Sequence, residues 1–131
     1  MADFDLTLAQ AHIFLIASEN NIEIAGHSSG GRAYRRSRRV KIRPVKSPVT
    51  YAVALHEFGH VLGRNSGRRV DKEVQAWEWA KANALVWTRR MNDTKRDALQ
   101  SYVKWAERKQ RTAKNGKVFI EQGHAIYRHV R

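Results

Sequence analysis

Two histidines one helical turn apart, His56 and His60, constrain this chain more than any other feature of its 131 residues. They lie in a segment that begins with Ser47, a favourable N-cap, followed by a proline that suits the first helical position, and that ends on Gly63. The sequence therefore predicts a helix over residues 48–62. Side chains four residues apart on a helix lie on one face, so we expect both imidazoles to point the same way.

The two imidazoles and the intervening Glu57 form the pattern H-E-x-x-H, which suits a zinc ion. Neutral imidazoles are good zinc ligands, and a catalytic zinc lowers the pKa of its water to about 7. Glu57 lies about 100° around the helix from His56, where its carboxylate can take a proton from the metal-bound water. The alternative is a structural pair of histidines. The stripe shared with Val49 and Val53 places both imidazoles on the buried face, where polar groups without partners are costly.

A catalytic zinc site has three protein ligands, and the next predicted helix, residues 71–87, offers the third. This run contains no glycine or proline and starts with Asp71, which suits the N-cap. Glu73 is the first member of its otherwise apolar stripe, where a carboxylate needs a partner. Two alternatives stay open at this point. Glu73 can simply complement the helix dipole, and Glu78 is a rival ligand although it lies off the stripe.

Two segments carry a resemblance to a known family, and they are His56-Glu57-Phe58-Gly59-His60 and Glu73-Val74-Gln75-Ala76-Trp77-Glu78-Trp79-Ala80. Together they resemble the gluzincin metallopeptidases, in which H-E-x-x-H is followed by E-x-x-A, and in particular the compact ImmA/IrrE-like peptidases and the minigluzincins. The resemblance covers about residues 40–88. It implies a zincin-like domain with Zn2+ as cofactor, His56, His60 and Glu73 as zinc ligands, and Glu57 as the general base.

The remaining periodicity predicts a helix-dominated α+β fold in one domain over residues 1–131. Residues 22–25 and 32–43 alternate apolar and polar side chains, which predicts a small antiparallel sheet packed on the two metal-bearing helices. Amphipathic helices are predicted near 5–19, with Leu8 and Leu15 on the inner side, and near 95–110, and a short strand is predicted near 117–121.

The strand at 39–43 is expected at the edge of the sheet, where it could accept an extended peptide substrate by strand addition. Arg39, Lys41 and Arg43 alternate with its apolar residues and would then bind substrate. The alternative is that these charges solvate the edge and prevent aggregation. The last residues, 111–131, are predicted to form a flexible tail. From this tail His124 and Tyr127 could reach the metal as oxyanion donors.

Charge and composition limit which classes of partner and which cell compartment we expect. The net charge is +13, and eight Lys or Arg residues lie between Arg32 and Lys46, just before the predicted metal helix. A field of this sign favours acidic peptides, proteins held on DNA, or nucleic acid itself. The chain has no cysteine, and Asp3 and Asp5 stand where a signal peptide would be positively charged. We therefore expect a cytoplasmic protein without a membrane partner.

The leading interpretation is a zinc-dependent endopeptidase, in which Glu57 activates a zinc-bound water to attack the peptide bond of an acidic or DNA-associated protein. The ImmA/IrrE resemblance implies a phage or mobile-element setting. The alternative, from another class, is a basic nucleic-acid-binding protein whose metal site is structural or degenerate. A third interpretation is a latent protease whose tail occupies the site.

Overall fold

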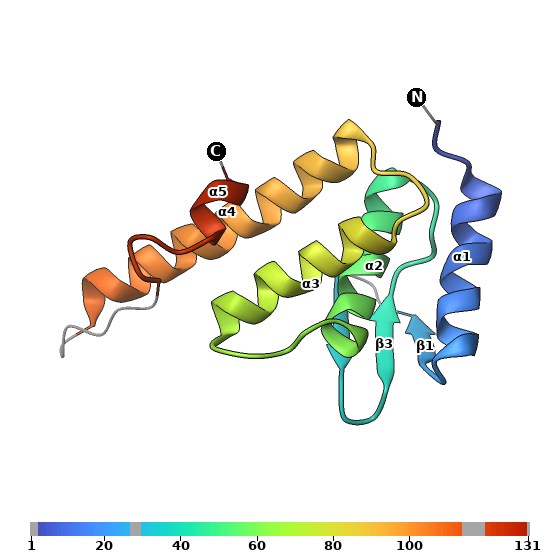
Figure 1. The fold of residues 1–131 in the computed structure, drawn as a ribbon, viewed down its shortest axis with the longest axis horizontal. Coiled ribbons are helices and arrows are strands. Elements are labelled where there is room, and N and C mark those ends of the chain that lie inside the picture. The colour runs from blue at the N-terminus through green and yellow to red at the C-terminus, as the bar shows by residue number, and fades with distance from the viewer. Residues whose placement is uncertain (1–2, 27–29, 114–119, 131) are drawn as a thin grey trace.

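The computed structural model describes residues 3–26, 30–113 and 120–130 (Figure 1). Helices dominate these ranges and accompany one small sheet, so the predicted α+β class is confirmed. The elements in chain order are α1 (Leu6–Glu19), β1 (Glu23–Gly26), β2 (Gly31–Tyr34), β3 (Arg39–Ile42), α2 (Pro48–Leu62), α3 (Arg69–Asn83), α4 (Arg89–Thr112) and α5 (Ile126–His129). The predicted strand near 117–121 falls largely outside the described residues. None of the described helices is long and apolar enough to cross a bilayer.

The three strands form a mixed sheet in the order β1-β3-β2. Strands β2 and β3 form the expected antiparallel hairpin, but β1 runs parallel to β3, so the prediction of an antiparallel sheet was wrong for β1. The prediction that residues 39–43 form an edge strand was also wrong, because β3 lies in the middle. Within the described chain the edges are β1 and β2. Period-two alternation identifies a strand and its faces, but it does not identify the neighbours of that strand.

The bounds of helix α2, Pro48–Leu62, are those that the sequence predicted. The Ser47 side chain accepts a hydrogen bond from the backbone N–H of Thr50, and the Thr50 hydroxyl accepts one from the N–H of Ser47, at 3.2 and 2.9 Å. The C-terminal end differs from expectation, because Gly63 is extended, with φ −79°, and not left-handed. There the guanidinium of Arg35 donates to the carbonyls of His60 and Gly63, at 3.1 and 2.9 Å. A hairpin arginine thus satisfies carbonyls that the helix itself leaves open.

The later helices begin earlier than predicted. Asp71 is not the N-cap of α3 but lies in its first turn, where its carboxylate accepts the N–H of Arg68 at 2.8 Å. Helix α4 begins at Arg89, six residues before the predicted start near 95, because Thr88 acts as its N-cap and accepts the N–H of Met91 at 3.2 Å. Residues 89–94, which precede the predicted start, are therefore helical.

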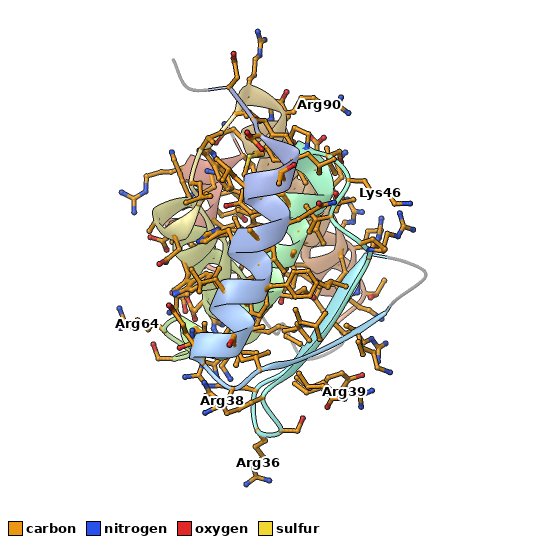
Figure 2. All side chains as sticks on the ribbon, turned by 90° about the vertical axis from the view of Figure 1, so that its right-hand side faces the viewer. Arg36, Arg38, Arg39, Lys46, Arg64 and Arg90 are labelled. Atoms are coloured by element: carbon orange, nitrogen blue, oxygen red, sulfur yellow. The ribbon has the colours of Figure 1, made fainter. Side chains whose placement is uncertain are left out.

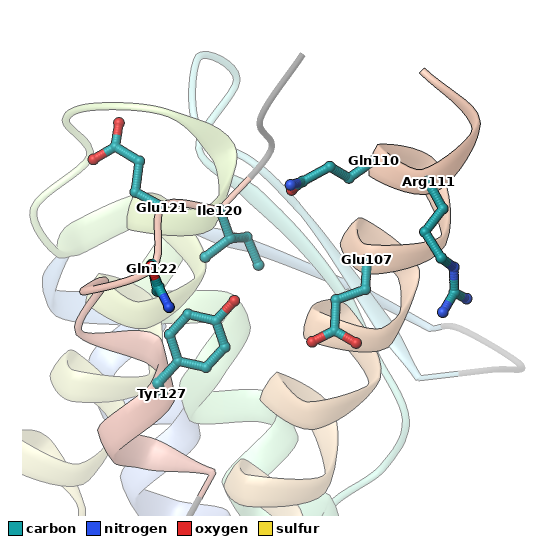
Figure 3. Close-up of a pocket in the computed structure, with 7 residues that line it drawn as sticks. All are labelled: Glu107, Gln110, Arg111, Ile120, Glu121, Gln122 and Tyr127. Atoms are coloured by element: carbon teal, nitrogen blue, oxygen red, sulfur yellow. The ribbon is translucent and has the colours of Figure 1, made fainter. Parts of the chain in front are cut away.

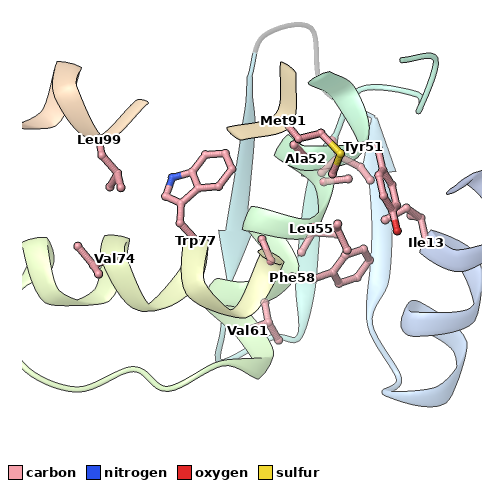
Figure 4. Packing of buried hydrophobic residues seen from close by; sticks show 14 of the residues in the cluster. Ile13, Tyr51, Ala52, Leu55, Phe58, Val61, Val74, Trp77, Met91 and Leu99 are labelled. Atoms are coloured by element: carbon pink, nitrogen blue, oxygen red, sulfur yellow. The ribbon is translucent and has the colours of Figure 1, made fainter. Parts of the chain in front are cut away.

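Helix α2 lies at the centre of the fold and contacts β2, β3, α1, α3 and α4. Its side chains Leu55 and Phe58 are fully buried, and Figure 4 shows Trp77 of α3 and Leu99 of α4 among the residues packed around it. The inner face of α1 differs from the prediction, because Leu8 is 58% and Leu15 is 53% exposed. The buried residues of α1 are Ala9, Ile13, Ile16 and Ala17. Because these elements pack around α2, the side chains of His56, Glu57 and His60 are held at defined positions in the fold.

Candidate metal centre

The site depends on a close crossing of α2 and α3. A β-carbon built on Gly59 would lie 2.4 Å from the carbonyl oxygen of Ala76, so the two helix backbones touch at this point. Only a glycine in α2 permits this approach. Glu73 lies one helical turn before Ala76, and the crossing therefore brings its carboxylate against the histidine face of α2.

Four candidate ligand atoms, from His56, His60 and Glu73, converge where the helices cross. The Glu73 Oε2 atom lies 2.7 Å from His60 Nε2, and its Oε1 atom lies 3.2 Å from His56 Nε2. The two Nε2 atoms are 3.1 Å apart. In a tetrahedral zinc site with bonds of about 2.0–2.1 Å, neighbouring ligand atoms are about 3.3 Å apart. The separations of 3.1 and 3.2 Å are close to that value, and the 2.7 Å contact would lengthen by about 0.6 Å around one ion. Ligand atoms of His56, Glu57 and His60 also lie within 4.8 Å of one another, a group that could hold a metal ion.

The rival carboxylate lies elsewhere on α3. Glu78 is exposed, and its charge acts on Lys95 of α4 and His129 of α5. Glu73, in contrast, contacts both imidazoles. Its role is therefore not limited to complementing the dipole of α3. Of the two glutamates weighed from the sequence, Glu73 is the one that the fold brings to the histidines.

Hydrogen bonds and opposite charges hold the side chains of His56, His60 and Glu73 together without a metal. Burial alone would raise the pKa of Glu73, but the hydrogen bonds and charges of His56 and His60 outweigh it and hold that pKa well below its usual range. Burial lowers the pKa of His60, and the hydrogen bond and charge of Glu73 outweigh that effect, so the His60 pKa is raised. The Glu73 carboxylate is therefore kept ionised, which is the form that binds a metal.

Neighbouring side chains hold His56 and Glu57 in place. The indole ring of Trp77 stacks on the imidazole of His56, with ring centres 4.3 Å apart and planes 14° from parallel. The Nδ1 atom of His56 lies 3.3 Å from Glu57 Oε1. Contacts of this kind orient a metal ligand and set which ring nitrogen faces the metal. Trp77 is a buried core residue, and its indole also covers one side of His56.

A glycine on the edge strand makes room for the buried Glu57. A β-carbon on Gly31 would lie 2.9 Å from the Cγ atom of Glu57 and 3.1 Å from its Oε2 atom. The backbone of β2 therefore passes directly over the glutamate side chain. The sequence analysis did not identify this contact, because nothing in the local sequence indicates that β2 crosses α2 there.

A pocket of about 440 Å³ opens over these residues, between the edge strand β2 and the N-terminal part of α3. It is lined by Gly31, Arg32, Ala33, Arg35, His56, Glu57, His60, Asn65, Arg69, Glu73 and Tyr102. Three of these residues are arginines, and the two carboxylates of the lining are those of Glu57 and Glu73, beside the histidines. The pocket is thus positively charged. Tyr102 of α4 was not identified as a site residue from the sequence, because its place in the pocket depends on how α4 packs in the fold.

The remaining predicted site residues lie outside this pocket. Arg39, Lys41 and Arg43 do not line it. On β3, Arg39 and Lys41 alternate with Val40 and Ile42, which are buried, so these two basic residues lie on the opposite face of the sheet. Arg43 follows the end of β3 and is exposed.

The two predicted oxyanion donors are also elsewhere. The Nδ1 atom of His124 accepts the N–H of Ile126 at 3.0 Å, and its Nε2 atom donates to the Asp71 carboxylate at 2.6 Å. Tyr127 lies in a separate pocket beside Glu107 of α4 (Figure 3). Their predicted role was wrong because the described part of the 111–131 tail packs on α3 and α4, with Ile126 fully buried.

Comparison of the chain with protein-family models, curated proteins and solved structures found no match.

Proposed function

We propose that this chain is a zinc-dependent endopeptidase in which His56, His60 and Glu73 hold the metal and Glu57 is the general base. The observation that carries the proposal is the convergence of the Glu73 carboxylate with both histidine Nε2 atoms, at 2.7 and 3.2 Å. Two imidazoles and one carboxylate are a ligand set that suits zinc and leaves a coordination position for a reactant. The resemblance of the two motifs to the gluzincins supports the same assignment.

Glu57 is positioned to move protons in such a reaction. A bound zinc ion would supply a Lewis acid that polarises the scissile carbonyl and makes water acidic near neutral pH. Glu57 is buried beside the ligand group, between Gly31 and His56, and its carboxylate faces the pocket. In the proposed mechanism it accepts a proton from the attacking water and returns it to the leaving amine.

Tyr102 and Arg69 are the residues we assign to the charge that develops on the carbonyl oxygen. Both line the pocket, and they come from different helices, α4 and α3. Burial raises the pKa of Tyr102, so its hydroxyl keeps the proton that it would donate. The Arg69 guanidinium supplies a permanent positive charge. Hydrogen-bond donors fixed in this way contribute more to the transition state than to the ground state.

The edge of β2 is where we place an extended substrate. Gly31, Arg32 and Ala33 of this strand line the pocket, and within the described sheet β2 pairs with β3 on one side only. A peptide can add to such an edge through backbone hydrogen bonds, with its scissile bond over the metal group. Arg32, Arg35 and Arg69 favour substrates with acidic residues near that bond, including acidic or DNA-associated proteins.

The test is cleavage of denatured casein, an acidic protein, by the zinc-loaded wild type and by Glu57→Gln. We expect the variant to lose at least about 100-fold in rate, because general-base catalysis contributes that much, while its zinc content stays at the wild-type level. Glu78→Gln changes the same type of residue on the exposed face of α3 and serves as the matched control. Full activity in Glu57→Gln, with no activity change in the control, would reject the proposed role of Glu57.

A further inference from the structure

The face of the sheet that points away from α2 carries an aromatic side chain among cations, and of this arrangement the proposed peptidase uses only Arg32, at the border of its pocket. The inner face packs on α2 through Val40 and Ile42, which are buried. Side chains alternate along a strand, so their neighbours point outward. In the register of the hairpin, Arg32 lies opposite Lys41 and Tyr34 lies opposite Arg39. We call these four residues, Arg32, Tyr34, Arg39 and Lys41, the outer face.

Tyr34 is an exposed aromatic side chain with the cations of Lys41 and Arg39 beside it. It is 37% exposed, and the ammonium nitrogen of Lys41 lies 5.8 Å from the centre of its ring. Arg39 is directly across the ladder from it. An open ring beside cations on a sheet can stack on another flat π-system while the cations bind anions attached to it.

Among the described residues of the sheet, acidic side chains are sparse on the outer face. Between Glu23 and Glu57 the sequence has eight Lys or Arg residues and no Asp or Glu. In the described sheet Glu23 is the acidic residue on this face, and its Oε2 atom lies 3.8 Å from Arg39 Nε. Figure 2 shows Arg36, Arg38 and Arg39 gathered at the hairpin end of the molecule, with Arg90 at the opposite end. The positive field therefore continues from the outer face around the hairpin.

We propose that the outer face binds single-stranded nucleic acid, with a base stacked on Tyr34 and phosphates held by Arg32, Arg39 and Lys41. Nucleotides supply both groups that this surface fits, a flat base and an attached anion, at short regular spacing. A duplex shields the faces of its bases, and an acidic peptide would use the cations but not the ring. The inference goes beyond the proposed peptidase and stands whether or not the chain cleaves proteins.

The experiment measures fluorescence anisotropy of labelled oligothymidylate and oligouridylate, about 12 nucleotides long, with the full chain. Tyr34→Ala should weaken binding about tenfold or more, since stacking on an aromatic side chain contributes that much per base, and Tyr34→Phe should bind as the wild type does. Lys41→Gln should lower the slope of log affinity against log salt by about 0.7, the value for one phosphate contact on a single strand. Glu23→Gln should strengthen binding.

Arg90→Gln is the matched control, because it removes the same charge at the far end of the molecule (Figure 2). It should leave the affinity unchanged. Binding of either single strand with the expected losses supports the proposal. Three results would overturn it: equal binding by Tyr34→Ala and the wild type, equal losses in Arg90→Gln and Lys41→Gln, or displacement of the oligonucleotide by polyglutamate as readily as by unlabelled oligonucleotide.

Discussion

Replacing Gly59 by alanine tests the helix crossing on which the metal group depends. The new β-carbon would lie 2.4 Å from the carbonyl oxygen of Ala76, whereas ordinary contacts begin at 3.4 Å. Backbone cannot rotate away as a flexible side chain does, so α3 must retreat by about 1 Å at this point. Glu73 lies one turn away and would lose its 2.7 Å contact with His60.

The expected cost has two measurable parts. Overpacking of this kind lowers the free energy of unfolding by about 1–3 kcal/mol, which urea denaturation of the metal-free protein measures. Displacement of a ligand by about 1 Å should also weaken zinc binding at least tenfold, as competition with a chelator would show. Gly26→Ala is the control, because a β-carbon there meets nothing within 4 Å. Wild-type stability and zinc affinity in Gly59→Ala would refute the argument that this contact sets the position of Glu73.

Three further substitutions test other parts of the account. Tyr102→Phe should lower kcat about 100-fold in steady-state peptidase assays while KM is unchanged, since it removes a donor to the transition state. Gly31→Ala should also lower kcat, because its β-carbon would displace Glu57, yet metal analysis should find zinc retained. Burial lowers the pKa of His12 below 6.5. Protonation of His12 should therefore lower the unfolding free energy as pH falls through 6.5, and thermal denaturation should show that His12→Gln lacks this contribution.

The parts of the fold that the sequence predicts well are those set by local chemistry. Helix α2 spans the predicted residues 48–62 because its cap, its proline and its apolar stripe all act within a few residues of one another. The spacing of His56 and His60 fixes their common face in the same local way. Glu73 was identified as the carboxylate on an apolar stripe, and that reasoning did lead to the residue that contacts both histidines.

The parts that the sequence did not predict depend on distant contacts. Helix α1 has apolar residues on more than one side, so only its packing decides that Ile13 is buried and that Leu8 and Leu15 are exposed. The parallel pairing of β1 with β3 likewise depends on how the chain returns to the sheet. Tyr102 enters the pocket because α4 lies across α3, and its own segment contains no sign of that role. Motif spacing therefore predicted which side chains converge better than it predicted the walls of the pocket.

The most direct test of the metal centre is the zinc content per chain of protein purified without added metal. The measurement compares the wild type with Glu73→Gln and with Glu78→Gln, which makes the same change on the exposed face of α3. The account predicts about one zinc ion per chain in the wild type and in Glu78→Gln, and a large loss in Glu73→Gln. Full zinc retention in Glu73→Gln, or no zinc in the wild type even after zinc is supplied, would contradict it.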